Sequence, residues 1–237
     1  MISVCMATYN GEKYLSQQMN SILDQLGKSD ELIIVDDLSG DRTIEIIKSF
    51  GDTRIKLIRN SNNSGVVKAF EKALDMASGD YIFLSDQDDV WLPDKVSAMM
   101  EKLDAGFDLV VSDAFILNKG IIQDQTFYSI RKSGPGFIKN AYKNTFIGCC
   151  MAFRAEYKKT ILPIPERISM HDAWIGQLIT IFGKVCFLDK PLIFYRRHDE
   201  NVTSMSRGNL KSVARKRVVD LICLISRSIH VKRAGNQ

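Results

Sequence analysis

The sequence predicts an α/β fold, in which a mostly parallel sheet is flanked by helices on both faces. Along the first half of the chain, short apolar runs alternate with segments whose apolar residues recur at helical spacing. The runs are apolar throughout rather than at every second position, which is typical of strands buried on both faces. Polar clusters follow the runs directly, at the strand ends where ligands bind in such sheets.

The first element is an apolar strand over residues 2–7, and a helix over 12–26 follows it. Leu15, Met19 and Ile22 share one face of that helix because they recur every three or four residues. The same alternation continues along the chain. It predicts strands over 31–37, 55–60, 81–86 and 108–117, and helices over 41–50, 66–77 and 94–103.

The alternation weakens past residue 118. The pattern there predicts a loop over 132–137, a strand over 148–154 and a helix over 172–182. The apolar segment 184–198 is predicted to form one strand or a hairpin. Pro191 in its middle restricts the pairing, because proline lacks the N–H that a central strand needs.

The composition excludes several classes of protein. The chain has 237 residues, of which 45% are hydrophobic and 25% charged, as is usual for a soluble globular protein. No apolar run reaches the length of a transmembrane helix and the N-terminus lacks a signal peptide, so we expect a cytoplasmic protein. Five cysteines without a C-x-x-C pair favour buried, reduced thiols over disulfides or a zinc site.

The C-terminal segment 206–237 differs in charge from the rest of the chain. It carries eight Lys or Arg and one Asp, whereas the preceding residues carry 24 basic and 27 acidic side chains. Its helical spacing of apolar residues predicts a basic amphipathic helix, with Leu210, Ala214, Val218, Leu221, Ile225 and Ile229 on one face. Such a helix can bind an anionic membrane surface, the rest of the chain or a second subunit. Nucleic acid is disfavoured, because no aromatic residues lie between the basic ones.

Four polar clusters directly follow the first four predicted strands. They are Thr8 to Asn10, Asp36 and Asp37, Asn60 to Ser64, and Asp86 to Asp89. The carboxyl ends of parallel strands meet at one edge of a sheet, so we expect these clusters to form one ligand site. Three carboxylates in the last cluster repel one another unless water solvates them or a cation binds.

Two common nucleotide-binding motifs are absent. The segment after the first strand, ATYNGEKYL, has one glycine, whereas a dinucleotide-binding turn needs G-x-G-x-x-G. The chain also lacks a G-x-x-x-x-G-K-[ST] loop, which cradles the phosphates of a nucleoside triphosphate. These two nucleotide-binding classes are therefore excluded.

Five motifs occur in the order and approximate spacing of one enzyme family. They are CMATYNGEKYL, LIIVDDLSGDRT, NNSG, YIFLSDQDDVWLPDK and HDAW, and with them residues 2 to about 200 resemble family 2 glycosyltransferases. The form SDQDDVW is similar to bacterial enzymes that build O-antigen or capsular polysaccharide, many of which are labelled rhamnosyltransferases. One such motif would be weak support, whereas five in register are specific.

The resemblance implies a GT-A (Rossmann-like) fold and inverting transfer from a nucleoside-diphosphate sugar, such as dTDP-rhamnose or a UDP-sugar. It divides the chain into a glycosyltransferase domain, residues 1–205, and the helical tail, 206–237. Residues 1–117 would bind the donor, and 118–205 would face a saccharide acceptor that is lipid-linked at the inner membrane face. The Q-x-x-R-W motif of processive members is absent, so we expect transfer of one sugar per event.

The resemblance also assigns residues to the nucleotide. Thr8, Tyr9 and Asn10 fall where the family contacts the base and the ribose. Asp37, with Asp36 beside it, falls where a carboxylate accepts a hydrogen bond from the pyrimidine ring. These five residues are therefore the predicted site of the base and ribose, and the resemblance assigns Asp86 to the nucleotide sugar as well as to the metal.

Asp86 and Asp88 match the two ends of the family's D-x-D motif, and Asp89 follows them. In the family these acids hold Mn²⁺ or Mg²⁺ against the diphosphate, and Asp88 is the expected direct ligand. An ion held in this way neutralises the charge that develops on the departing diphosphate.

Asp172 matches the acid of the family's E-D pair, which is the catalytic base, although His171 stands here in place of Glu. A base on the side opposite the leaving group can take the proton of the acceptor hydroxyl. Arg196, Arg197 and His198 match a late segment that closes on the donor in the family, where they can contact its phosphates.

Each assignment also has a purely structural explanation. Asp36 and Asp37 could cap the helix that begins near Asp41, and Asp172 could cap its own helix. The acidic cluster could be a solvated turn. His171 and His198 could have structural roles, and Trp91 could be a core residue.

Two further functions share parts of this pattern. A sugar nucleotidyltransferase would have a similar sheet and metal-binding acids, but it needs a Gly-rich basic loop after the first strand, which is absent. A non-catalytic sugar-nucleotide-binding protein would not need Asp172. The activity of a variant at this position therefore separates an enzyme from a binding protein.

Overall fold

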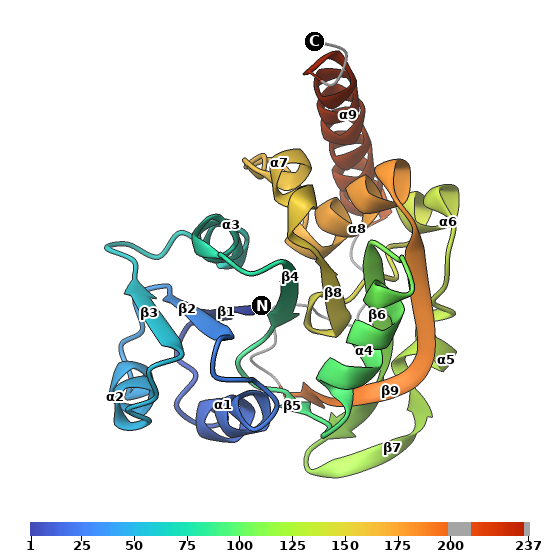
Figure 1. Ribbon diagram of the computed structural model, residues 1–237. Coiled ribbons are helices and arrows are strands. Elements are labelled where there is room, and N and C mark those ends of the chain that lie inside the picture. The colour runs from blue at the N-terminus through green and yellow to red at the C-terminus, as the bar shows by residue number, and fades with distance from the viewer. Residues whose placement is uncertain (199–209, 235–237) are drawn as a thin grey trace.

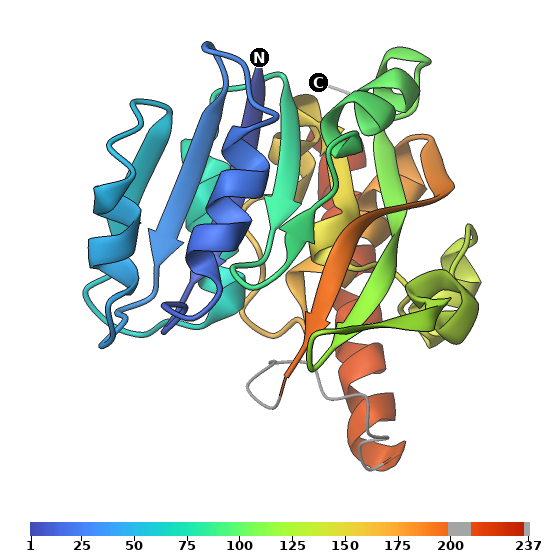
Figure 2. The ribbon, with the colours of Figure 1, turned by 90° about the horizontal axis from the view of Figure 1, so that it is seen from below.

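The strands form one curled sheet of nine, covered by helices on both faces (Figures 1 and 2). The structure, a computed structural model, describes residues 1–198 and 210–234. The strand order is β3-β2-β1-β4-β8-β6-β9-β5, and β7 pairs with β6 outside this path. The centre of the sheet therefore lies between β4, from the first half of the chain, and β8 and β6, from the second.

The first half of the sheet is parallel, as predicted. Its strands are β1 (Ile2–Thr8), β2 (Glu31–Asp36), β3 (Ile55–Arg59) and β4 (Tyr81–Ser85), and β1 lies between β2 and β4. Every residue of β2 is buried, because helices cover both faces of the sheet. Helices α1 (Leu15–Leu23) and α2 (Thr43–Ser49) lie on one face and α3 (Val66–Met76) lies on the other (Figure 1).

The second half of the sheet is mixed. Strand β8 (Met151–Arg154) is antiparallel to both β4 and β6 (Leu109–Asn118), whereas β9 (Val185–Arg197) runs parallel to β6. The short strand β5 (Val90–Trp91) pairs with β9 in antiparallel orientation. Helix α4 (Lys95–Asp104) joins β5 to β6, as predicted.

Several elements of the second half refine or add to the prediction. Of the strand or hairpin predicted over 184–198, the structure has one strand, β9, in which Pro191 pairs with Asp113 at an irregular point of the ladder, where a missing N–H is tolerated. The predicted strand over 148–154 begins with a 3-10 turn, η1 (Gly148–Cys150). Besides β5, the unpredicted elements are β7 (Ile121–Thr126), α5 (Phe127–Arg131), α6 (Phe137–Tyr142), η2 (Ala155–Tyr157) and α7 (Lys158–Ile161).

The predicted tail helix is α9 (Leu210–Ala234), which packs against α8 (His171–Phe182) and extends beyond the sheet (Figure 1). Leu224 is buried at this contact. Arg227 donates hydrogen bonds to three backbone carbonyls of the segment 160–163, at 2.6 to 2.9 Å. One face of α9 thus docks on the rest of the chain, which is one of the three roles expected for the tail.

The opposite face of α9 carries exposed aliphatic side chains. We call it the exposed stripe; it consists of Val218, Leu221, Ile222, Ile225 and Ile229, which are 39% to 61% exposed. Among the described helices, including α9, none is both long enough and apolar enough to span a bilayer. The stripe therefore gives α9 a second, uncovered surface.

The docking of α9 predicts different stabilities for two neighbouring alanine variants. Leu224→Ala should lower the free energy of unfolding by about 2 kcal/mol or more, because it removes a buried side chain and leaves a cavity. Ile225→Ala should change it by less than about 0.5 kcal/mol, because Ile225 is 52% exposed. Urea unfolding of both variants measures the difference, and equal values would contradict the docking.

Candidate functional site

The loops at the carboxyl ends of the first strands lie together, as predicted. At the end of β1, Thr8 donates its hydroxyl to Asp36 Oδ1 at the end of β2 (3.3 Å). Gln87, which follows β4, accepts the N–H of Tyr9 and donates to its carbonyl (2.9 and 3.0 Å). Side chains therefore join three strand ends into one edge.

Asp37 holds the loop that follows β3. Its Oδ1 accepts hydrogen bonds from the Asn60 amide (2.8 Å) and from the N–H and hydroxyl of Ser64 (2.9 and 3.0 Å). Its Oδ2 accepts the N–H of Gly65 (2.7 Å). Desolvation opposes ionisation of this buried acid, but these donors hold the pKa of Asp37 below its ordinary value. Gly65 is the one donor to Oδ2 among the described residues, and a carboxylate oxygen has a second lone pair. Oδ2 can therefore accept a further hydrogen bond from a ligand.

Asn10 and Asp36 order the turn that leads to α2. Asp36 is fully buried and accepts the N–H and hydroxyl of Ser39 (3.0 and 2.5 Å). The N–H of Asn10 donates to Ser39 Oγ and its side-chain oxygen accepts the N–H of Gly40 (both 2.9 Å). Tyr9, between these residues, is 49% exposed and faces solvent at the edge of the sheet.

A capping role for Asp36 and Asp37 is wrong. The N–H of Thr43, in the first turn of α2, bonds Asp41 Oδ1 (3.0 Å) instead. Asp36 and Asp37 stabilise the loops around the strand ends, and so they shape the predicted nucleotide site.

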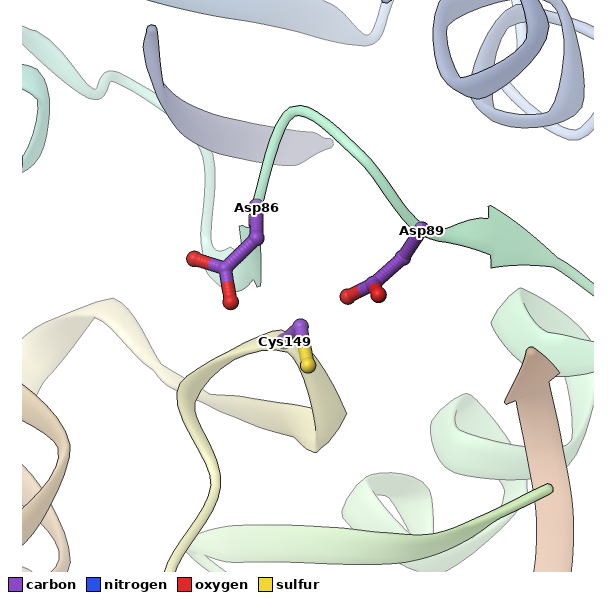
Figure 3. Close-up of side chains that lie close together, drawn as sticks. All are labelled: Asp86, Asp89 and Cys149. Atoms are coloured by element: carbon purple, nitrogen blue, oxygen red, sulfur yellow. The ribbon is translucent and has the colours of Figure 1, made fainter. Parts of the chain in front are cut away.

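Asp86, Asp89 and Cys149 point toward one another below the loop that follows β4 (Figure 3). One ligand atom from each lies within 4.8 Å of the others. Desolvation and the charge of Asp88 raise the pKa of Asp86 to about 7, and they raise that of Asp89 as well. Desolvation also raises the pKa of the Cys149 thiol. Burial without a cation therefore opposes the charged forms of all three groups.

Lys95 brings a buried positive charge to the same cluster. Its ammonium donates to the carbonyl of Cys149 (2.7 Å) and lies 4.8 Å from the centre of the Trp91 ring. Trp91 is 3% exposed and packs on Phe83, so the core position considered for it is confirmed. Burial lowers the pKa of Lys95, against the attraction of the nearby acids Asp89 and Asp86.

Asp88 points toward the end of β9 instead. Its Oδ2 lies 2.7 Å from His198 Nε2. Arg196 links the same strand end to the loop, since its N–H donates to Asp89 Oδ1 (2.9 Å) and its Nε donates to the carbonyl of Asp88 (2.7 Å). The three acids expected around one metal therefore divide into two groups, Asp86 with Asp89 and Asp88 with His198.

A hollow of about 1240 Å³ opens beside Asp88 and His198. Its walls come from the loop before α1, from the β6–β7 hairpin and from the end of β9. Basic side chains predominate among its charged residues, which are Lys13, Lys119, Asp124, Arg196 and Arg197, and His198 lies beside them. The structure thus places the three residues predicted to contact phosphate on a surface that suits an anion.

Asp172 is the second residue of α8 and is half-buried. Its Oδ1 accepts the N–H of Ala173 (2.5 Å) and the Asn144 amide (3.3 Å). Desolvation raises the pKa of Asp172 to about 6, against the effect of these two bonds. Met170 occupies the N-cap position of α8, so a role for Asp172 as the N-cap is wrong.

Gly148 and Cys149 lie between Asp172 and the acidic cluster. A methyl group added at Gly148 would come within 3.7 Å of Asp172 Cβ, whereas Cys149 lies against Asp86. The charge of Asp172 contributes to the raised pKa of Asp86. The predicted base and the predicted metal acids therefore interact electrostatically, and adjacent residues of one turn, Gly148 and Cys149, contact each of them.

His171 has a structural role. It is 3% exposed, and its ring stacks on Phe70 with centres 4.0 Å apart. Neither ring nitrogen has a hydrogen-bond partner within residues 1–198 and 210–234, and burial lowers the pKa of His171 to about 3. A side chain at Gly148 would meet its Nε2 at 2.9 Å, so glycine is needed there. The neutral ring therefore packs behind Asp172.

Four residues of the site were not singled out from the sequence. Gln87 and Lys95 lie inside the motif around Asp86 to Asp89, which is a signal that could have identified them. Asn144 and Cys149 lie far from every predicted site residue in sequence and carry no such signal. Together the side chains present a carboxylate and an imidazole on one side and a half-buried carboxylate on the other. This arrangement can hold a cation-bound anion and take a proton from a hydroxyl.

Comparison with known proteins identifies relatives over most of the chain. A family model described as glycosyl transferase family 2 matches residues 3–162. The putative teichuronic acid biosynthesis glycosyltransferase TuaG of Bacillus subtilis (strain 168) is 35% identical over 219 residues, which cover 86% of this chain and 82% of TuaG. The dTDP-rhamnosyl transferase RfbG of Shigella flexneri is 30% identical over 217 residues, which cover 83% of this chain and 72% of RfbG.

Among solved structures, residues 1–349 of S. aureus TarS in complex with UDP-GlcNAc superimpose with a TM-score of 0.75. The superposition covers 93% of this chain and 66% of that structure, at 22% identity. It confirms the predicted fold class. The sequence matches confirm the resemblance on which the site residues were assigned.

Proposed function

The chain belongs to glycosyl transferase family 2, and on this premise we propose that it transfers one sugar per event, with inversion, from a nucleoside-diphosphate sugar to a saccharide of a cell-surface polysaccharide. The convergence of the strand-end loops, the Asp88–His198 pair and Asp172 on one region carries the proposal. Inversion needs one base opposite the leaving group, and Asp172 is the residue proposed for it.

The proposed donor carries a pyrimidine base, as dTDP-rhamnose and the UDP-sugars do. Oδ2 of Asp37 accepts one bond from Gly65 and has room for the ring N–H of a pyrimidine. Thr8, Tyr9 and Asn10 lie at the same edge, where the base and ribose would bind. The names of RfbG, a dTDP-rhamnosyl transferase, and of the TarS complex with UDP-GlcNAc support this choice.

The donor diphosphate is proposed to bind with Mn²⁺ or Mg²⁺ beside Asp88 and His198. Their close pair of oxygen and nitrogen, 2.7 Å apart, suits Mn²⁺ better than Mg²⁺, which prefers oxygen ligands alone. Asp86 and Asp89 complete the acidic side: Oδ1 of Asp89 accepts the N–H of Arg196, whereas its Oδ2 has no hydrogen-bond partner among the described residues. When bound, such an ion neutralises charge on the departing diphosphate. Arg196 and Arg197 would contact the phosphates.

Asp172 is the proposed base. It would accept the proton of the acceptor hydroxyl while the Asn144 amide and the Ala173 N–H hold its carboxylate in place. Because its pKa is about 6, it is ionised near neutral pH and still basic enough to take the proton.

A panel of donors tests the proposal. With Mn²⁺ present, one pyrimidine donor among dTDP-rhamnose, UDP-glucose and UDP-GlcNAc should raise the melting temperature. At 100 times its Kd, the donor should add about 2.7 kcal/mol to the free energy of unfolding. Slow hydrolysis of the same donor should accompany the shift. Calorimetry with GDP-mannose, which carries a purine, is the control. If GDP-mannose stabilises the protein as well as every pyrimidine donor does, the base assignment is wrong.

We further propose that the acceptor is lipid-linked and that the exposed stripe of α9 contacts the inner face of the cell membrane. The stripe is aliphatic, and exposed basic residues lie beside it at Arg215, Lys216, Lys232 and Arg233. A helix with this composition lies in the interface of an anionic bilayer. Docking of the other face of α9 would hold the domain against that surface.

Vesicle binding tests the membrane contact. The Ile222→Asn, Ile225→Asn double variant should lose most of its binding to phosphatidylglycerol vesicles, because burying each isoleucine contributes about 1.5–3 kcal/mol. Wild-type binding should weaken with salt, since each basic residue near the surface contributes about 1 kcal/mol. The matched control is Ile121→Asn, Ile122→Asn on β7, where both isoleucines are also exposed. Equal co-sedimentation of the two double variants would reject the contact.

A further inference from the structure

The contacts of α9 fall on the segment that leads into α8. Ser169 donates its N–H to Asp220 Oδ1 (2.8 Å) and its hydroxyl to Asp220 Oδ2 (2.6 Å), so both carboxylate oxygens are used. Ser169 is three residues before Asp172 in the sequence. Asp220 is also the one acidic residue of the segment 206–237, which is otherwise basic. The single acid of the tail therefore binds the approach to the proposed base.

We propose that Asp220 is a positioning residue for sugar transfer, which through Ser169 fixes the start of α8 and with it the carboxylate of Asp172. The inference rests on the proposed role of Asp172 as base. It makes α9 part of the catalytic domain, whereas the sequence placed the tail outside it.

The start of α8 needs an external support of this kind. Its N-cap, Met170, has an extended backbone and makes no side-chain capping bond. At the N-cap, Ser, Thr, Asp and Asn are preferred because their side-chain oxygen accepts hydrogen bonds from the first N–H groups of the helix. Asp220 supplies oxygen acceptors one residue earlier, at Ser169, and so anchors the chain where it enters the helix. A shift of about 1 Å in a reacting group can reduce a rate by about 10²-fold.

A second residue of α9 brings charge to the same place. Arg217 pairs with Asp220 at 3.5 Å and lines, with Asp220 and Ala173, a small cavity between α8 and α9. Its charge favours the ionised form of Asp172. The other titratable groups that face Asp172 are Asp86, across Gly148 and Cys149, and the neutral ring of His171. Arg217 is therefore the cation that opposes the desolvation of Asp172.

Steady-state kinetics of Asp220→Ala test the positioning role. We expect kcat to fall by roughly 10- to 10²-fold with the donor KM unchanged, because Asp220 bonds Ser169 and pairs with Arg217, neither of which is proposed to bind the donor. Asp220→Asn keeps one acceptor oxygen and should recover part of the loss. The matched control is Arg227→Gln, which also weakens the docking of α9 but acts on the carbonyls of 160–163. It should lower the melting temperature with a much smaller effect on kcat.

Two further variants keep the test decisive if Asp220→Ala fails to fold. Ser169→Ala removes the hydroxyl bond alone and should lower kcat in the same direction. Arg217→Gln should move the acidic limb of the pH–rate profile to higher pH, whereas Lys216→Gln, an exposed neighbour, should leave it in place. The inference is overturned if these variants change only the melting temperature. Normal transfer by Asp172→Asn would instead overturn the proposed base, so the two failures are distinguishable.

Discussion

Asp88→Asn is expected to abolish the stabilisation that Mn²⁺ and a nucleoside diphosphate together give the protein. In the wild type, UDP or dTDP with Mn²⁺ at 100 times the Kd should add about 2.7 kcal/mol by mass action. Asn cannot supply the negative charge of the carboxylate, and its amide donates hydrogen bonds where an ion needs an acceptor. Differential scanning fluorimetry with and without EDTA measures the metal-dependent part.

A second acid serves as the matched control for this experiment. Asp94→Asn removes the same charge from the same segment, but Asp94 is exposed and paired with Lys190, away from the site. It should keep the full Mn²⁺ effect. His198→Asn should lose most of it, because His198 Nε2 lies against Asp88 Oδ2. Equal metal-dependent shifts in the wild type and in Asp88→Asn would show that the ion binds elsewhere.

The strand ends are the part of the site that could be predicted from the sequence. Parallel strands buried on both faces have unbroken apolar runs, and their carboxyl ends meet at one edge. This geometry brought Thr8 to Asp36 and Asp37 to Asn60. Local pattern was sufficient because each of these residues ends or directly follows its own strand.

Contacts between distant segments could not be predicted in this way. His198 contacts Asp88, which is 110 residues away in the sequence. Cys149 lies near Asp86, in a 3-10 turn that the sequence predicted as part of a strand. Strand β7 was missed because Ile121 and Ile122 are exposed, and pairing with β6 rather than burial makes this segment a strand. Such contacts depend on how the second half of the sheet closes.

In the tail helix α9, too, the sequence predicted the element but not its contacts. Its apolar spacing correctly predicted a helix, but Val218, Leu221, Ile225 and Ile229 form the exposed stripe. The docking face contains Asp220 and Arg227, whose polar side chains bind backbone groups and Ser169. Apolar periodicity therefore identified the helix without identifying the face that docks.

Asp172→Asn is expected to lower turnover by about 10²–10⁴-fold, the usual contribution of a general base. The amide cannot accept the proton of the acceptor hydroxyl, although it has nearly the shape of the carboxylate. Donor affinity and melting temperature should change little, because Asp88, His198 and the nucleotide loops are untouched. The wild-type rate should follow ionisation of Asp172, whose pKa is about 6. Its kcat/KM should therefore be full above that pH and fall about tenfold per pH unit below it.

Asp113 and His171 are poorly suited to replace Asp172 as base. Asp113 is 2% exposed and its Oδ1 already accepts the N–H groups of Ala114 and Tyr128 (2.7 and 2.8 Å). His171 is buried against Phe70 with a pKa of about 3, so its ring lies away from the acceptor. A purely structural Asp172 predicts near-normal turnover in Asp172→Asn and a loss of stability in Asp172→Ala. Turnover, donor affinity and melting temperature of both variants decide between the two roles, and loss of turnover in Asp172→Asn at unchanged stability identifies the base.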